Sequence, residues 1–179
     1  MNPATGDVTA LYGIANVIDT GNGGHTVVSK NTNDSVTGGS DNDIIDASSV
    51  TGEVEIHAGS GDDTIYGGKG NDYIEGGSGN DEINLGTTES DTDTIIVVRT
   101  DDISNESKVR SFGSDTINGA GSTDELVFAL NTGTELNPTY TLGYSISELS
   151  FAKDGRNLVI TAGEESDGNN LTISDYFTE

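Results

Sequence analysis

The chain lacks cysteine and has few prolines, basic residues and aromatic side chains. Because none of its 179 residues is cysteine, disulfides, thiolate metal sites and cysteine catalysis are excluded. Two prolines against 25 glycines argue against a proline-rich linker. Seven Lys and Arg against 31 Asp and Glu give a formal net charge of −24. This charge excludes binding to a nucleic-acid backbone, which needs a basic face.

Long hydrophobic stretches are also missing. No apolar run approaches the roughly 18 residues of a membrane-spanning helix, and no charged start with an apolar core follows Met1. We therefore expect neither a membrane span nor an N-terminal export signal. Leu, Ile, Val and Phe make up about 22% of the chain, close to the roughly 20% at which strongly charged chains stay disordered. The length allows one domain or one elongated array, and something besides apolar burial must help it to fold.

The sequence does contain a repeat of nine residues. Three frames, at residues 58–66, 67–75 and 76–84, follow one another without a gap. The sixth position is always Asp and the eighth is always Ile. The three aspartates are Asp63, Asp72 and Asp81. An internal period of this kind is typical of solenoids, in which stacked units bury a continuous core.

Looser copies extend the repeat in both directions. The frame at 47–57 has eleven residues, the frame at 85–96 has twelve, and a 13-residue insertion at 97–109 separates it from two further frames. About ten units are recognisable in total. The sixth position of the looser frames is occupied, in chain order, by His25, Asp34, Asp43, Val54, Asp93, Asp115 and Asp124.

Each unit combines a tight turn with a very short strand. Glycines at positions one, two and four allow positive φ, and Asn or Asp at position five is the next most tolerant choice. The last three positions alternate out, in, out, which predicts a strand with one buried side chain. Two units complete an 18-residue coil that stacks on the next at about 4.8 Å. The sequence therefore predicts an all-β fold, a parallel β-roll.

Stacked coils place the sixth-position side chains in two ladders. One ladder holds His25, Asp43, Asp63 and Asp81, and the other holds Asp34, Val54, Asp72 and Asp93. Carboxylates about 5 Å apart repel by roughly 3 kcal/mol at an effective dielectric of 20, so the ladders need cations. Oxygen ligands in flexible geometry suit Ca²⁺ better than Mg²⁺ or Zn²⁺. We expect the best sites on either side of Asp63, and weak or empty sites beside Val54 and His25.

This spacing resembles that of the RTX nonapeptide family, whose repeat Gly-Gly-x-Gly-x-Asp-x-U-x binds calcium. The resemblance covers roughly residues 20–127 and is most specific over 58–84. It implies a right-handed parallel β-roll in which turn carbonyls and the sixth-position Asp hold several Ca²⁺ ions between coils. The metal-binding residues that it implies are Gly39, Asp41, Asp43, Gly59, Ser60, Gly61, Asp63, Gly68, Gly70, Asp72, Gly76, Ser78, Asp81 and Asp93. The chain departs from the family pattern at Asp41, Val54 and Ser90.

The same resemblance implies a function. RTX proteins are bacterial and leave the cell unfolded through type I secretion channels, and extracellular modules bind Ca²⁺ at about 10⁻⁴ to 10⁻³ M. We therefore expect a monomeric, non-catalytic module of a secreted or cell-surface adhesin, unfolded in the cytosol and folded by calcium outside the cell. Its expected partners are calcium and the secretion machinery. The alternatives are an accessory module of a secreted enzyme, with carbohydrate as ligand, and the repeat region of a toxin.

The flanks of the repeat have a different pattern. We expect an N-terminal cap at residues 1–19, the roll at 20–127 and a β-rich C-terminal cap at 128–179, because solenoids need atypical ends. Asp154-Gly155 between two apolar runs predicts a hairpin.

Motifs for catalysis and sugar binding are weak. Neither His-Glu-x-x-His nor Gly-x-Ser-x-Gly occurs, so no enzyme activity is expected. Tyr66 and Tyr73 are expected at adjacent outward strand positions, where they could stack on a sugar, although plain surface packing is the favoured interpretation.

Overall fold

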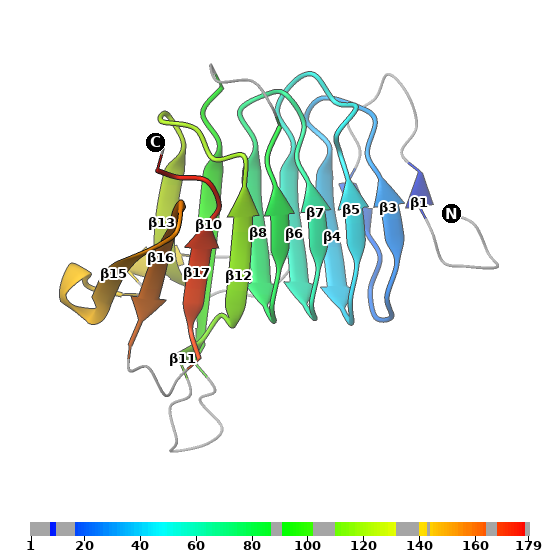
Figure 1. The fold of residues 1–179 in the computed structure, drawn as a ribbon. Coiled ribbons are helices and arrows are strands. Elements are labelled where there is room, and N and C mark those ends of the chain that lie inside the picture. The colour runs from blue at the N-terminus through cyan, green and yellow to red at the C-terminus, as the bar shows by residue number, and fades with distance from the viewer. Residues whose placement is uncertain are drawn as a thin grey trace.

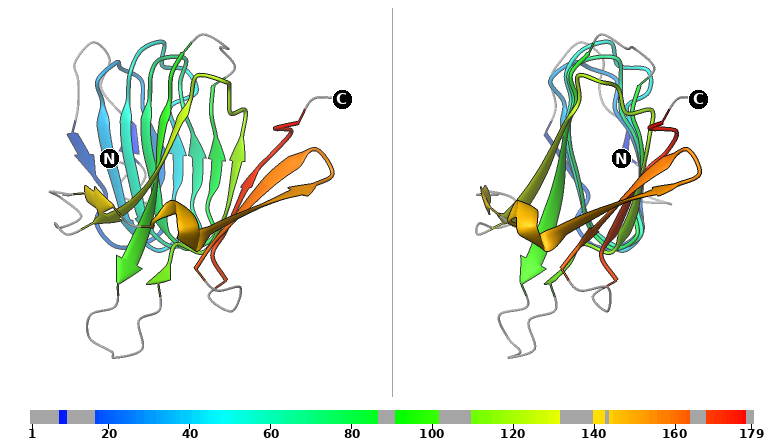
Figure 2. Two further views of the ribbon diagram at one scale, coloured as in Figure 1. Left: turned by 90° about the vertical axis from the view of Figure 1, so that its left-hand side faces the viewer. Right: turned by 60° about the vertical axis from the view of Figure 1, so that its left-hand side comes forward.

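Two β-sheets lie face to face in the computed structural model, which describes residues 8–9, 17–86, 91–101, 110–131, 140–142, 144–163 and 168–177 (Figure 1 and Figure 2). One sheet has the strand order β1-β3-β5-β7-β9-β12-β17-β16-β15, and the other has the order β14-β13-β10-β8-β6-β4-β2. Up to β10, successive strands alternate between the sheets, so two strands and two turns make one coil. No helix in the described part of the chain has the length and apolarity needed to cross a bilayer.

Most strands are short. The first sheet contains β1 (Val8–Thr9), β3 (Thr26–Val28), β5 (Ile44–Asp46), β7 (Thr64–Tyr66), β9 (Glu82–Asn84), β12 (Ser114–Asn118), β17 (Asn170–Ile173), β16 (Asn157–Ala162) and β15 (Leu149–Asp154). The second contains β14 (Tyr140–Leu142), β13 (Glu125–Asn131), β10 (Thr94–Asp101), β8 (Tyr73–Ser78), β6 (Glu55–Ser60), β4 (Ser35–Ser40) and β2 (Val17–Asp19). A further strand, β11 (Arg110–Ser111), pairs with β10, and a 3₁₀ turn covers Ile146–Glu148.

Strands of successive coils pair in parallel, with equivalent repeat positions in register. Ile65 of β7 lies opposite Ile83 of β9, and Ile56 of β6 lies opposite Ile74 of β8. Each of these pairs joins the eighth positions of two frames, so the period in the sequence becomes the hydrogen-bond register of the sheets. The predicted parallel β-roll is confirmed.

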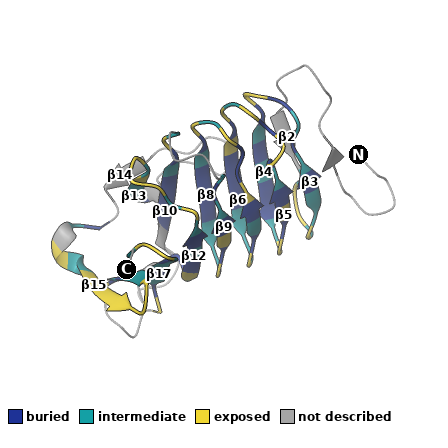
Figure 3. Ribbon diagram, turned by 45° about the horizontal axis from the view of Figure 1, so that its top comes forward, coloured by how far each residue is buried: buried dark blue, intermediate teal, exposed yellow. Residues whose placement is uncertain are grey.

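The core is a stack of eighth-position side chains between the two sheets. These side chains are at most 3% exposed from the first regular coil to β12, and Figure 3 shows the buried positions running along the strands. They are Val27, Val36, Ile45, Ile56, Ile65, Ile74, Ile83, Ile95 and Ile117. In the regular units 58–66, 67–75 and 76–84 the eighth-position Ile is the one large apolar side chain that is fully buried. Such a core is thin, because a fully buried aliphatic side chain contributes only about 1.5–3 kcal/mol.

The two regions expected to interrupt or precede the roll contain strands that continue it. β10 runs to Asp101 and pairs with β13 as far as Arg99, so the first five residues of the expected insertion 97–109 form a strand rather than a loop. Residues 102–109 lie outside the described residues. Within the expected N-terminal cap, Val8 of β1 pairs with Val27 and Val17 of β2 pairs with Ser35, each in parallel register.

The C-terminal flank extends both sheets, since β14 pairs antiparallel with β13 in the eight-stranded sheet, and it fills the end of the core. β17 pairs in parallel with β12, and β16 and β15 then add to it in antiparallel order (Figure 2). The rings of Phe112, Phe128 and Tyr144 have centroids 6.2 Å apart in all three pairs, and they pack against the last apolar layer. The predicted hairpin is present, but Asp154 pairs with Asn157, so its turn consists of Gly155 and Arg156 rather than Asp154 and Gly155.

The two tyrosines considered for sugar stacking lie on different sheets. Tyr66 belongs to β7 and Tyr73 to β8, which is in the opposite sheet. The Tyr73 ring lies 5.7 Å from the His57 ring of the neighbouring strand β6. The expectation of adjacent outward positions is therefore wrong, because successive units alternate between the sheets.

Candidate metal sites at the turns

The turns of the roll lie along two edges, which we name by their positions in Figure 1. The lower edge consists of the turns that end at His25, Asp43, Asp63, Asp81 and Asp115, each of which leads into a strand of the nine-stranded sheet. The upper edge consists of the turns that end at Asp34, Val54, Asp72, Asp93 and Asp124, each of which leads into a strand of the eight-stranded sheet. These two sets contain the two ladders expected from the sequence and extend each of them by one rung, Asp115 and Asp124.

At both edges the sixth-position aspartates form a hydrogen-bonded ladder, which begins at His25 at the lower edge and at Val54 at the upper edge. One carboxylate oxygen, Oδ1, accepts the backbone N–H of the equivalent residue in the preceding coil. At the lower edge the N–H groups of His25, Asp43, Asp63 and Asp81 donate to the next Asp at 2.6, 2.8, 3.0 and 3.0 Å. At the upper edge those of Val54, Asp72 and Asp93 donate at 3.0, 2.8 and 3.0 Å. His25 and Val54 thus occupy their rungs as backbone donors without supplying a carboxylate.

Asp115 and Asp124 also belong to these ladders. Both occupy the sixth position of a frame in the sequence, but neither is among the residues expected to bind metal. Oδ1 of Asp115 accepts the N–H of Asp81 across 34 residues, and Oδ1 of Asp124 accepts that of Asp93 across 31. The frames at 110–118 and 119–127 already contained this signal. The 18-residue spacing does not reveal these two rungs, because residues 102–109 and the longer turn before Asp93 interrupt that spacing.

A second ladder runs through the fifth position of the lower edge in the opposite direction. Oδ1 of Asn42 accepts the N–H of Asp62, Oδ1 of Asp62 accepts that of Asn80, and Oδ1 of Asn80 accepts that of Ser114 at 2.9–3.0 Å. Here the oxygen bonds to the following coil, whereas the sixth-position oxygen bonds to the preceding one. Each lower-edge turn is therefore tied to both of its neighbours.

Three carboxylate oxygens at the lower edge are buried and accept no hydrogen bond within the described residues. They are the Oδ2 atoms of Asp43, Asp63 and Asp81, whose residues are 1%, 2% and 2% exposed. A Cβ placed on Gly38 would lie 2.6 Å from Oδ2 of Asp43 and would overlap the carbonyl oxygen of Ala58 in the next turn. A carboxylate and a carbonyl from adjacent turns therefore converge in front of Gly38. Because a buried polar oxygen without a partner is costly, these atoms fit a bound cation.

Burial also shifts the acidity of the ladder. Burial raises the pKa of Asp63 to about 6 and that of Asp81 to about 7; the N–H group on the preceding rung opposes this rise, and the charge of that rung adds to it. Burial raises the pKa of Asp43 as well, and that of Asp115 to about 8. A cation between the rungs would favour the charged carboxylates and offset the loss of hydration.

Glycine is required in the lower-edge turns because of its positive φ and because the backbone of the neighbouring turn leaves no room for a Cβ. Gly39, Gly59 and Gly77 at position two have φ of +106°, +113° and +111°. Gly61 at position four has φ of +129°, and a Cβ there would approach the backbone of Asp41. Ser60 pairs with Ser78 in the parallel register, so these turns stack residue on residue.

Asp41 occupies position four, where the neighbouring turns have Gly61 and Gly79, and it adopts φ of +69°. Its charge also raises the pKa of Asp43, although burial is the larger cause. An L-residue pays about 1–2 kcal/mol in this conformation, and Asp somewhat less than most. We expect Asp41→Gly to raise the free energy of unfolding in calcium by about 1 kcal/mol, measured by urea denaturation. An unchanged or lower midpoint would contradict this and would indicate that the Asp41 carboxylate helps to bind metal.

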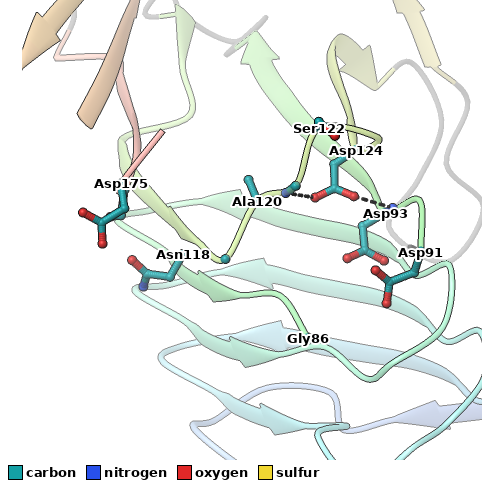
Figure 4. Close-up of a pocket in the computed structure, with 11 residues that line it drawn as sticks. Gly86, Asp91, Asp93, Asn118, Ala120, Ser122, Asp124 and Asp175 are labelled. Atoms are coloured by element: carbon teal, nitrogen blue, oxygen red, sulfur yellow. Dashed lines mark hydrogen bonds between the residues drawn. The ribbon is translucent and has the colours of Figure 1, made fainter. Parts of the chain in front are cut away.

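Of the remaining expected ligands, Gly76 belongs to the lower-edge turn before Asp81, where a Cβ on it would overlap Oδ2 of Asp81, and the others lie at the upper edge. Gly68, Gly70 and Asp72 form one regular turn, and Gly86 of the next turn lies directly over Gly68. Asp93 and Asp124 line a cavity of about 510 Å³ together with Gly86, Asp91 and Asn118. Figure 4 shows the Asp124 carboxylate between its own turn and Asp93. It accepts the backbone N–H of Asp93 and that of Gly121 in its own turn.

Side chains alone do not complete a metal site in the described part of the chain. No group of three His, Asp or Glu residues is placed there so that it could hold a metal ion. A cation between two turns would therefore take one carboxylate from each turn and complete its coordination with backbone carbonyls and water. Such an all-oxygen set of variable geometry suits Ca²⁺.

A family model for the RTX calcium-binding nonapeptide repeat, in four copies, matches residues 19–49 and 55–87. The chain carries RTX calcium-binding repeats. The matched RTX segments cover a little more than a third of the chain and include Asp43, Asp63, Asp72 and Asp81. Residues 50–54, which the match omits, include the carboxylate-free rung Val54. No curated protein matches the chain.

Proposed function

We propose that this chain is a calcium-folded RTX module of a secreted bacterial protein, and that it acts through its structure rather than through catalysis. The observation that carries the proposal is the set of three buried Oδ2 atoms at Asp43, Asp63 and Asp81, which have no hydrogen-bond partner in the described structure. Without metal these oxygens destabilise the roll, and with metal they hold adjacent turns together.

The balance of energies supports a strong dependence on calcium. Ordering nine residues costs on the order of 9–18 kcal/mol of backbone entropy. The buried Ile of a regular unit contributes only about 1.5–3 kcal/mol, and hydrogen bonds about 1 kcal/mol each. Each Ca²⁺ ion at ten times its dissociation constant adds about 1.4 kcal/mol. Several sites filling together can decide whether the chain folds.

The cellular role follows from where calcium is abundant. Extracellular modules bind Ca²⁺ at about 10⁻⁴ to 10⁻³ M, far above cytosolic levels. The chain would stay loose inside the cell, pass through a type I secretion channel and fold outside as a monomer. In a large adhesin such a module would extend or cap the protein at the cell surface, and its net charge of −24 would keep it soluble.

Circular dichroism in chelator and in calcium tests this proposal. In EGTA at neutral pH the spectrum should be that of a disordered chain, and millimolar Ca²⁺ should convert it to a β spectrum. Magnesium at the same concentration should have a much smaller effect, because it requires a stricter octahedron. A complete β spectrum in EGTA would contradict the proposal.

A further inference from the structure

The tip of the β15–β16 hairpin and the turn after β17 border an open hollow at the C-terminal end of the roll. In Figure 2 the orange hairpin extends beyond the body of the roll, and the red end of the chain lies beside its tip. The hollow is lined by residues 153–157 of the hairpin and by Asp175 and Phe177, and its volume is about 670 Å³. This volume lies within the range of roughly 300–1,000 Å³ that is typical of small-molecule sites.

Contacts between the hairpin and the chain after β17 hold the two sides of the hollow together. Nε of Arg156 lies 3.2 Å from Oδ1 of Asp175, and Oδ1 of Asn157 accepts the N–H of Asp175 at 3.1 Å. The N–H of Phe177 donates to the carbonyl oxygen of Arg156 at 2.9 Å, and Nζ of Lys153 lies 4.6 Å from the centroid of the Phe177 ring. The walls are therefore in place before a ligand arrives, which lowers the entropic cost of binding.

Exposed aromatic rings extend the surface beside the hollow. Tyr176 is 55% exposed, and its ring centroid lies 5.1 Å from that of Phe177. Phe151 is 57% exposed and lies on the same face of β15 as Lys153, because side chains alternate along a strand. Of the four large apolar side chains that are exposed in the described part of the chain, two are thus grouped here. A grouped apolar surface of this kind indicates contact with a ligand.

The charged groups that line the hollow balance one another. Lys153 and Arg156 supply two positive charges, and Asp154 and Asp175 supply two negative ones, whereas the whole chain carries −24. The guanidinium of Arg156 has five N–H donors, of which the one on Nε meets Asp175, and each carboxylate offers about four acceptor positions. A ligand in the hollow therefore meets strong donors and strong acceptors beside aromatic rings, without a net charge.

A sugar ring matches this combination. Its hydroxyl groups both donate and accept hydrogen bonds, and such bonds are stronger when the protein group is charged. Its C–H face is apolar and can pack on the electron-rich face of an aromatic ring. An acidic polysaccharide would instead be repelled by the net charge of −24 and would find no net positive charge in the hollow to compensate.

We propose that this hollow binds a neutral saccharide, with Asp154 and Arg156 bonded to its hydroxyl groups and Phe177 in contact with its ring. The site would give the module a ligand of its own on glycan surfaces, which goes beyond the proposed function. It lies in the C-terminal flank and is lined by none of the ladder aspartates, so it does not depend on where the metal ions bind.

NMR spectra of the ¹⁵N-labelled full chain in millimolar Ca²⁺ test the proposal. Cellohexaose, mannohexaose and xylohexaose are the neutral probes, and a hyaluronan hexasaccharide is the acidic one. At least one neutral probe should shift the N–H signals of residues 153–157 and 175–177, and the acidic probe should bind more weakly. No shift with any neutral probe, shifts confined to other parts of the chain, or tighter binding of the acidic probe would overturn the proposal. A chain without β structure in calcium would instead contradict the proposed function.

The variants Phe177→Ala and Tyr66→Ala form a matched pair. Tyr66 is a 39% exposed aromatic residue on β7 of the same sheet, but it does not line the hollow. Phe177→Ala should weaken binding of the neutral probe about tenfold, whereas Tyr66→Ala should leave it unchanged. Equal affinities in the two variants would overturn the proposal.

A further variant avoids the contact between Phe177 and Lys153, whose loss could loosen the hairpin. Asp154→Asn keeps the shape of an exposed side chain and removes its charge, so binding should weaken about fivefold while the β spectrum in calcium stays that of the wild type. Wild-type affinity in Asp154→Asn would contradict the role assigned to this carboxylate and overturn the proposed arrangement.

Discussion

Gly77→Ala should prevent the roll from folding even in saturating calcium. Gly77 has φ of +111°, and a Cβ placed there would overlap the carbonyl oxygen of Gly59 in the preceding coil. That oxygen belongs to backbone paired in the parallel register, so it cannot move aside as a flexible side chain would. The cost combines left-handed strain of about 1–2 kcal/mol with overpacking of up to about 3 kcal/mol or more. This exceeds the roughly 1.4 kcal/mol that one ion contributes at tenfold excess.

Gly155→Ala is the matched control for this effect. Gly155 also has a left-handed φ, of +61°, but no atom lies within 4 Å of the position where its Cβ would be. It should cost only about 1 kcal/mol, which is the conformational penalty without the overlap. Circular dichroism in millimolar CaCl₂ separates the two, because the Gly155 variant should keep the wild-type β spectrum and the Gly77 variant should lose it. Two variants with equal stabilities would show that stacking of the turns is not the source of the glycine requirement.

The sequence was sufficient to predict the roll because one period carries both the core and the ladder. Ile65, Ile74 and Ile83 were expected inside from their place in the frame, and they are 0%, 0% and 3% exposed. His25 and Val54 were expected to occupy rungs of the ladders, and their backbone N–H groups do so. A strict repeat leaves little freedom of register, since a slip of one residue would turn every buried Ile outward.

The features that could not be predicted depend on contacts between distant residues. The frames do not distinguish the turn before Asp72 from the turn before Asp81, although Oδ2 is bonded in one and, among the described residues, unpartnered in the other. That choice depends on the neighbouring turns, whose stacking a single frame does not contain. The parallel pairing of β12 with β17, Asp115 opposite Leu171, joins a repeat to a segment with no period. The end of a solenoid is covered by a segment whose shape fits the last coil, and the local period of the sequence does not contain that information.

Lowering the pH in chelator should favour the metal-free roll, which is the opposite of the usual acid denaturation of proteins. Burial raises the pKa of Asp63 and Asp93 to about 6 and that of Asp81 to about 7, from 3.8 in the unfolded chain. The folded state therefore holds protons that the unfolded chain has released. The resulting stability is complete below about pH 4 and is lost as the pH rises through 6 to 7. At about 1.4 kcal/mol per pKa unit, Asp81 alone corresponds to roughly 4 kcal/mol.

The measurement compares EGTA-treated protein at mildly acidic and neutral pH by circular dichroism and urea denaturation. The β signal and the denaturation midpoint should both be higher in acid, whereas the calcium concentration at half-saturation should rise there, because protons compete with Ca²⁺ for the same carboxylates. Acid also reduces the net charge of −24 and hence the general repulsion. The double variant Asp63→Asn, Asp81→Asn separates the two causes, since it keeps nearly all of the surface charge and removes two of the buried titrating groups. Its metal-free stability should depend much less on pH than that of the wild type. An equal pH dependence in both proteins would assign the effect to overall charge, and the buried ladder would then not be the element that makes the roll depend on calcium.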